Sequence, residues 1–282
     1  MADPRFVWQL RDRTLDLTKP RVMGIVNVTP DSFSDGGRFA TTEAAVAHAR
    51  ELLRQGADLL DVGGESTRPG SQPIPLEEEL ARVVPVVAEL ARSCDVPLSV
   101  DTCKAEVARQ ALAAGAHVVN DVTALRGDPA MAEVVRAGSA GVVLMHMQGT
   151  PATMQIAPSY EDVVAEVTAF LDARLQAAKD LGIAAERVVL DPGIGFGKTS
   201  EHNLRLLSGL HHLGRLGRPV LLGVSRKGFL GRLLGRSVDE RLAGSLAVVC
   251  HALARKAVQV VRVHDVAATR DAIEVFSALD AV

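Results

Sequence analysis

Short runs of β-branched residues alternate with longer amphipathic stretches along nearly the whole chain. The longer stretches are rich in Ala, Leu, Glu and Arg, which is typical of helices, whereas the short runs are typical of strands. Eight strands are expected, at Val22–Val28, Asp58–Val62, Leu98–Asp101, His117–Asn120, Gly141–His146, Arg187–Asp191, Val220–Val224 and Val258–His264. Helices are expected at Thr42–Gln55, Leu76–Ser93, Lys104–Ala114, Ser159–Leu181, Glu201–His211, Asp239–Arg255 and Val266–Leu279. Near-continuous apolar strands between helices predict a parallel sheet that is buried on both faces.

Eight strand–helix units favour a closed (β/α)8 TIM barrel over an open doubly wound sheet. After residue 20 each unit has about 33 residues, which is the length of one such unit with a short loop. No linker-like segment interrupts the pattern, so residues 1–282 are predicted to form a single domain. Within residues 1–20, Phe6–Gln9 and Thr14–Asp16 flank a charged turn. We expect them to form a short β-hairpin over the N-terminal end of the barrel.

Charge and cysteine content limit the possible partners and the compartment. The chain has 31 Lys and Arg against 34 Asp and Glu, a net charge of −3, which argues against nucleic-acid or acidic-membrane binding by bulk charge. No run of about 20 apolar residues occurs, so no spanning helix is expected. Cys94, Cys103 and Cys250 are too widely spaced for a metal knuckle. An odd, sparse set of cysteines suits a reducing compartment, and a cytoplasmic location is predicted.

Polar or charged residues follow all eight expected strands. In a barrel these strand ends meet at one rim, where the active site is built. The groups are Asn27, Asp61, Asp101, Asn120–Asp121, His146, Asp191, Ser225–Lys227 and Arg262–His264. The first two strands run into long polar loops, residues 27–37 and 61–70, of a kind that closes over ligands. The rim is therefore predicted to be functional.

Each of these groups also has a structural interpretation. Asp101 and Asp191 end apolar strands, where an unpaired carboxylate costs several kcal/mol, so a ligand-binding role is favoured. For Asp61 and Asp121, capping a helix or holding loop amides is the favoured interpretation. His146 fits a core histidine as well as a ligand-binding one. The helical histidines are expected to be surface or packing residues: His48, His202, His211, His212 and His251.

The segment Gly193–Thr199 resembles a phosphate-binding P-loop between a strand and a helix. The P-loop pattern requires Gly five positions before its Gly-Lys pair, where this chain has Pro192. The segment is therefore not a mononucleotide cradle. Its glycines instead allow the backbone to approach a flat ligand closely, with Phe196 available to stack.

The rim groups suggest a ligand with two chemically different ends. Arg68, Lys227, Arg262 and His264 suit an anion such as phosphate or diphosphate. The deeper groups Asp101, Asn120 and Asp191 suit a polar heterocycle that presents several N–H donors. No Ser–His–Asp or Cys–His nucleophile is evident in the sequence. The chemistry predicted is displacement of a good leaving group by positioning and charge stabilisation.

Eight motifs in order resemble those of dihydropteroate synthases. They lie at residues 23–37, 61–70 (DVGGESTRPG), 100–102, 120–121, 144–149, 191–198 (DPGIGFGK), 225–227 and 262–264. The resemblance implies a TIM-barrel enzyme of folate biosynthesis that acts as a homodimer in the cytoplasm. It would condense 6-hydroxymethyl-7,8-dihydropterin diphosphate with p-aminobenzoate by a dissociative displacement, releasing 7,8-dihydropteroate and diphosphate with the help of Mg²⁺.

The resemblance also implies a role for individual residues. The pterin ring would be held by Asp101, Asn120, Asp191, Lys227, Met145 and Gly223. The diphosphate would be bound by Asn27, Arg68, Arg262 and His264, with Asn27 also binding Mg²⁺. The p-aminobenzoate site would be lined by Thr67, Arg68, Pro69, Phe196 and Lys227. The residues implied in catalysis are Asp101, Lys227, Asn27 and Asp35, the last by ordering the first two loops.

Cys103 and Gly228 depart from the family pattern, in which Ser or another residue is more usual at position 103 and Ser is frequent at position 228. Gly228 lacks a hydroxyl that would help to bind p-aminobenzoate or a sulfonamide mimic. Two other functions compete with the synthase. A methyltetrahydrofolate:corrinoid methyltransferase would bind pterin but needs no diphosphate site, so Arg262 and His264 favour the synthase. A silent pterin-binding paralogue could lack Asn27, Thr67, Arg68 or Lys227, and all four are present.

Overall fold

Eight parallel strands form a closed barrel in the computed structural model, which describes residues 6–28 and 38–280. The strands are β3 (Arg21–Asn27), β4 (Leu59–Gly63), β5 (Leu98–Asp101), β6 (Val118–Asp121), β7 (Gly141–Met145), β8 (Val188–Asp191), β9 (Leu221–Leu222) and β10 (Val260–Val263). They pair in the order β8-β7-β6-β5-β4-β3-β10-β9. A bridge between Leu190 and Val220 closes the ring, and the Leu190 amide donates to the Pro219 carbonyl at 2.9 Å. The predicted TIM barrel is confirmed.

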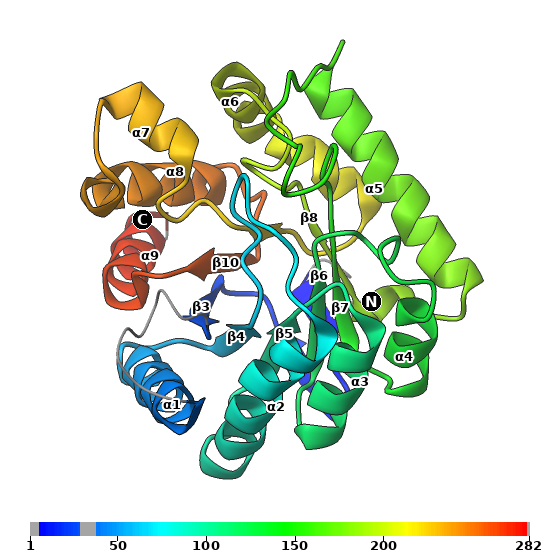
Figure 1. The fold of residues 1–282 in the computed structure, drawn as a ribbon. Coiled ribbons are helices and arrows are strands. Elements are labelled where there is room, and N and C mark those ends of the chain that lie inside the picture. Colours follow the sequence, from blue (N-terminus) through cyan, green and yellow to red (C-terminus); the bar gives the residue numbers. More distant parts are fainter. Residues whose placement is uncertain (1–5, 29–37, 281–282) are drawn as a thin grey trace.

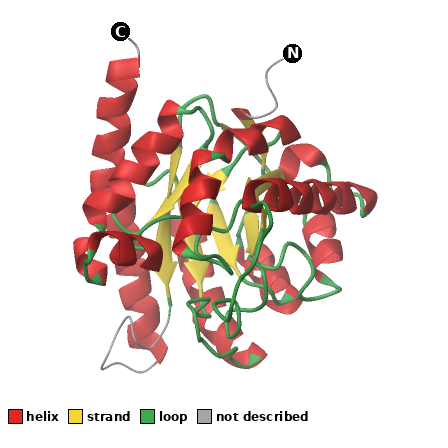
Figure 2. Ribbon diagram, turned by 90° about the horizontal axis from the view of Figure 1, so that it is seen from above, coloured by secondary structure: helices red, strands yellow, loops and turns green. Residues whose placement is uncertain are grey.

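Helices surround the strands on all sides (Figures 1 and 2). They are α1 (Arg38–Arg54), α2 (Leu76–Ser93), α3 (Ala105–Ala114), α4 (Met131–Ala137), α5 (Val163–Asp180), α6 (Ser200–Ser208), α7 (Gly228–Leu234), α8 (Leu242–Ala254) and α9 (Val266–Asp280). The short helices α4 and α7 were not predicted, and the strand expected at Val220–Val224 is reduced to β9. Within the described ranges, no helix is both long and apolar enough to cross a membrane.

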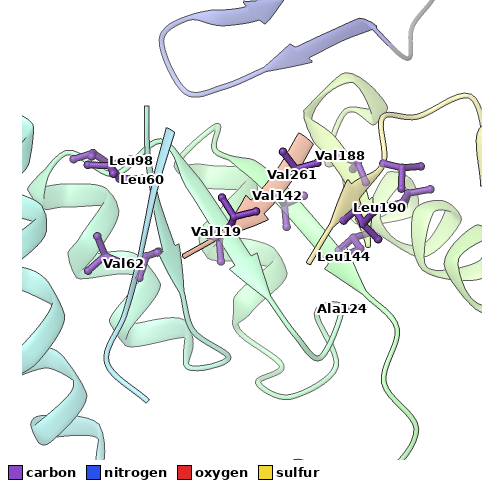
Figure 3. Packing of buried hydrophobic residues seen from close by; sticks show 14 of the residues in the cluster. Leu60, Val62, Leu98, Val119, Ala124, Val142, Leu144, Val188, Leu190 and Val261 are labelled. Carbon is purple, nitrogen blue, oxygen red and sulfur yellow. The ribbon is translucent and has the colours of Figure 1, made fainter. Parts of the chain in front are cut away.

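Alternate residues of each strand face different cores. One set packs against the helices and includes Leu60, Val62, Val142 and Leu144 (Figure 3). The other set points into the barrel. Its layer nearest the N-terminal end, the floor of the barrel, is apolar and consists of Met23, Leu59, Val118, Val143, Val189, Leu221 and Val260. This two-faced burial explains why the strands are apolar at nearly every position.

A two-stranded hairpin, β1 (Val7–Gln9) and β2 (Thr14–Asp16), covers the N-terminal end of the barrel as predicted. Trp8 is fully buried against the lowest interior layer. Its indole N–H donates to the carbonyl of Arg187 at 2.8 Å, just before β8. The hairpin therefore closes this end, and a ligand site can form at the opposite, C-terminal end.

We expect Trp8→Ala to lower the free energy of unfolding by about 3–5 kcal/mol, because it leaves a cavity under the barrel floor. Urea denaturation followed by circular dichroism measures the change. The control is Ile156→Ala, since Ile156 is 75% exposed, and it should cost less than about 0.5 kcal/mol. Equal losses in the two variants would mean that the hairpin is not part of the core.

Candidate active site

A buried cluster of opposite charges lies above the apolar floor of the barrel. The Arg262 guanidinium on β10 donates from Nε to Asp61 Oδ2 at 2.6 Å and from Nη2 to Asp101 Oδ2 at 2.7 Å. Asn120 on β6 donates from Nδ2 to the same Asp61 oxygen at 3.0 Å. Four strands thus contribute one hydrogen-bonded polar layer, whose carboxylates are compensated by the guanidinium.

Asp61 corrects one of the sequence interpretations. It neither caps a helix nor holds loop amides, but lies fully buried inside the barrel next to Arg262. Its Oδ1 has no hydrogen-bond partner among the described residues. Asp121 does behave as expected, because it accepts hydrogen bonds from the amides of Thr123 and Leu125, each at 2.8 Å.

Burial shifts the pKa values of Asp101 and Asp191 upward and that of Lys227 downward. Burial raises the pKa of Asp101 to about 7, against the opposing effect of Arg262. It also raises the pKa of Asp191, whose Oδ1 accepts from the Gly193 amide at 2.7 Å. Burial lowers the pKa of Lys227 to about 8, although the charge of Asp191 opposes this shift. These groups lie close enough to influence one another, as expected of one site.

An apolar wall borders the charged groups at the mouth of the barrel. Phe196 packs with Met145, Met147, Met154 and Val122. The Lys227 ammonium lies 4.2 Å from the centre of the Phe196 ring. An added Cβ at Gly223 would meet nothing within 4 Å, so the backbone is open there. The wall and this opening can accommodate a flat ring.

The glycine-rich segment after β8 is not a phosphate cradle. Gly193 has φ +65°, and a Cβ there would lie 1.8 Å from the His146 carbonyl, so only glycine fits. Lys198 is fully buried and points inward, donating to the carbonyls of Gly193 at 2.9 Å and Phe196 at 3.0 Å. This buried lysine therefore supports the segment that carries Phe196.

His146 is a core histidine. Its Nδ1 lies 2.9 Å from the Lys198 ammonium, and its ring packs edge-on against Phe170. Burial, with a smaller effect of Lys198, lowers the pKa of His146 to about 3, so the ring is neutral at pH 7. This settles the choice that the sequence left open.

Asn27 and His264, two of the predicted diphosphate ligands, belong to neighbouring strand ends. Asn27 ends β3 and pairs in register with Gly63, the last residue of β4. His264 follows β10, and burial followed by the charges of Arg262 and Arg226 lowers its pKa to about 4. Neutral His264 can still donate one N–H to an anion.

The predicted p-aminobenzoate residues of the second loop lie between β4 and α2. Thr67 is partly buried, whereas Arg68 and Pro69 are exposed. At the base of this loop Glu65 forms an ion pair with Lys104, which also binds the buried Glu79. Asp35 and the rest of residues 29–37 lie outside the described part of the chain.

The sequence placed Asp61 and Ser225 at the rim without these contacts, and it did not identify Lys198 or the Glu65–Lys104 pair. Asp61 had a detectable signal, because it follows Leu59 at the two-residue spacing of an inward face. The others act through partners that are distant in sequence, such as Ser225 and His264. The local pattern of one sequence does not show which distant residues will contact each other.

Buried donors and acceptors for a heterocycle, placed beside cations at a barrel mouth, define a pterin-binding enzyme of the TIM-barrel class. Residues 23–264 match the family model described as "Pterin binding enzyme". A dihydropteroate synthase of Neisseria meningitidis serogroup B is 49% identical over 98% of both chains. The chain belongs to the dihydropteroate synthases, transferases of folate biosynthesis.

Solved structures agree with this assignment. A Xanthomonas albilineans dihydropteroate synthase with 4-aminobenzoic acid superposes with a TM-score of 0.92, at 52% identity over 99% of each chain. Another from the same organism, in complex with 7,8-dihydropteroate, gives a TM-score of 0.88 at 50% identity, covering 98% of this chain and 99% of that one.

Lys198 should make stability depend on pH. Burial lowers its pKa from 10.5 to about 7, so between these values the unfolded chain binds a proton that the folded chain does not. Stability therefore rises with pH in this window, by up to about 1.4 kcal/mol per pH unit. The unfolding free energy of wild type minus that of Lys198→Met should therefore increase from pH 7 to pH 9, as measured by urea denaturation. A pH-independent difference would contradict the assignment.

Proposed function

We propose that this site condenses 6-hydroxymethyl-7,8-dihydropterin diphosphate with p-aminobenzoate, giving 7,8-dihydropteroate and diphosphate. The observation that carries the proposal is the buried layer of Asp61, Asp101, Asn120 and Arg262, which lies next to further cationic groups. Such a layer matches the N–H-rich edge of a pterin, and the cations match its diphosphate.

The pterin ring would occupy the barrel mouth above the charged layer. Asp101, Asn120 and Asp191 would accept from or donate to its pyrimidine edge, and Lys227 would donate to a ring acceptor. Met145 and Gly223 would contact the ring itself, since one is apolar and the other leaves open space. Burial strengthens each of these hydrogen bonds relative to water.

The diphosphate would be bound by Asn27, Arg68, Arg262 and His264. Arg262 uses Nε and one Nη2 hydrogen on the two carboxylates, which leaves other guanidinium hydrogens for an anion. Neutral His264 would add one donor. Together these groups would stabilise the negative charge that develops as the leaving group departs.

The residues present fit Mg²⁺ carried by the diphosphate. Among the described residues, no three His, Cys, Asp or Glu side chains are placed to hold a metal ion. Mg²⁺ needs no such cage, because it usually keeps several waters and shares phosphate oxygens with one or two protein ligands. Asn27 at the end of β3 would supply an oxygen ligand. The ion would neutralise charge on the diphosphate.

The reaction would proceed by dissociation. The bond between the exocyclic carbon and the diphosphate oxygen breaks first, and its electron pair leaves with diphosphate. The Asp101 carboxylate would stabilise the resulting pterin cation. The p-aminobenzoate nitrogen, held near Thr67, Arg68, Pro69, Phe196 and Lys227, would then form a bond to the exocyclic carbon and release its proton to the departed diphosphate. An aniline is already unprotonated at pH 7, so no general base is required.

The first two loops would close over this intermediate and keep water from trapping it. Asp35 would help to order them. The base of the second loop already has a fixed anchor in the Glu65–Lys104 ion pair. The exposed Arg68 side chain at its tip would approach the anion.

A homodimer and a cytoplasmic location are part of the proposal. Exposed apolar side chains on the later units support a dimer: Leu233 and Leu234 on α7, Val275 and Leu279 on α9. Helix α8 packs against both of these helices (Figure 1). Sedimentation velocity would contradict the dimer if the protein ran as a monomer at micromolar concentration.

Free thiols at Cys94, Cys103 and Cys250 suit a reducing compartment, which supports the proposed cytoplasmic location. Cell fractionation tests this location.

Diphosphate release tests the activity directly. Purified protein is given dihydropterin diphosphate and Mg²⁺, with and without p-aminobenzoate. We expect release that depends on p-aminobenzoate, with an equal amount of dihydropteroate. Tight pterin binding without release would instead indicate a silent paralogue, and methyl transfer from a methylated pterin would indicate the methyltransferase.

We expect Asp101→Asn to lower kcat by about 100-fold or more, because it removes the negative charge next to the pterin cation. The matched control is Cys103→Ser, two residues away. Burial raises the pKa of the Cys103 thiol to about 12, so it is not a thiolate nucleophile, and the variant should retain activity within about twofold. Steady-state kinetics at saturating substrates compare the two. Equal activities would rule out charge stabilisation by Asp101.

A further inference from the structure

The Ser225 hydroxyl is a buried polar group with no role in the reaction described above. Ser225 is 7% exposed and lies between β9 and α7, next to the end of β10. Its Oγ accepts from the backbone amide of His264 at 3.1 Å and lies 3.0 Å from the Nδ1 atom of the same residue. One hydroxyl thus contacts both the backbone and the ring of the histidine.

We propose that Ser225 is a positioning residue, which holds the His264 ring in the tautomer that carries its proton on Nε2. In this form Nε2–H donates to an oxygen of the diphosphate. The inference rests on the proposed function, because it concerns the diphosphate end of the same site.

Hydrogen-bond accounting selects this tautomer. The Ser225 oxygen already accepts the His264 amide proton, and the hydroxyl still has its own hydrogen to donate. Among the side chains that the structure describes, the one that forms a hydrogen bond with this hydroxyl is His264, through Nδ1. If Nδ1 carried the proton, the buried hydroxyl hydrogen would have no partner, which is unfavourable.

The same tautomer suits the charge around the ring. Arg262 and Arg226 lie near His264, and with burial they keep it neutral at pH 7. A neutral imidazole has one donor and one acceptor nitrogen, so the choice of tautomer decides whether the outward nitrogen attracts or repels an anion. Arg226 itself is held by Asp265, which leaves Ser225 as the direct contact of the ring.

A double-mutant cycle tests the proposal, with inorganic diphosphate as the probe and titration calorimetry as the readout. Ser225→Ala should weaken diphosphate binding by about tenfold, equivalent to one lost hydrogen bond. In the His264→Ala background the same change should have an effect of less than about twofold, since the ring is absent. Ser225→Thr keeps the hydroxyl and should bind nearly as wild type. Binding of 6-hydroxymethylpterin, which has no diphosphate, should not change.

Other outcomes would overturn the inference. An equal loss in both backgrounds would mean that Ser225 acts on the fold and not through His264. If the wild-type protein binds diphosphate and Ser225→Ala binds it equally well, the inference is wrong but the proposed function stands. If the wild-type protein binds no diphosphate, the proposed function is wrong as well. Nitrogen-15 NMR of wild-type protein needs no variant: we expect Nε2 protonated and Nδ1 bare, and the opposite pattern would contradict the proposal.

Discussion

The double ion pair of Arg262 with Asp61 and Asp101 is the interaction on which the site depends. Two carboxylates inside a barrel are each costly to bury, and one guanidinium at 2.6 and 2.7 Å compensates both. Removal of the arginine would leave two uncompensated charges, so these residues operate as a unit. The apolar floor and Trp8 beneath them exclude water from below. The proposed pterin end of the site is consequently built from strand residues of the barrel.

The barrel was predictable because its signal is repeated eight times and each repeat is locally clear. The parts that were missed have weak local signals. Helix α7 contains Gly228 and Gly231, residues of low helix propensity, and is seven residues long. It forms because Phe229 and Leu230 are buried against the rest of the molecule. Such tertiary stabilisation overrides propensity and is not visible in the segment itself.

The site was predictable where a polar residue ends an apolar strand, as Asp101, Asn120 and Asp191 do. Asp61 was misinterpreted because a carboxylate before a glycine-rich loop is also a common cap or loop anchor. The inward spacing from Leu59 was the stronger signal. The pairing of Ser225 with His264, 39 residues apart, depends on β9 and β10 being neighbours in the barrel. The alternating pattern predicts that strands are adjacent, but not which side chains then meet.

The pKa shifts follow from one electrostatic balance. Asp101 and Asp191 are shifted toward the neutral form, and Lys227 and His264 toward the uncharged base, because each is buried. Burial thus favours the uncharged form of each of these groups, which lowers the cost of placing them together in one site. An incoming diphosphate would oppose this shift at Lys227, since its negative charge favours the protonated ammonium, while His264 would stay neutral and donate through one N–H. In the proposed function, the same small set of residues would therefore receive a neutral heterocycle and a highly charged leaving group in one site.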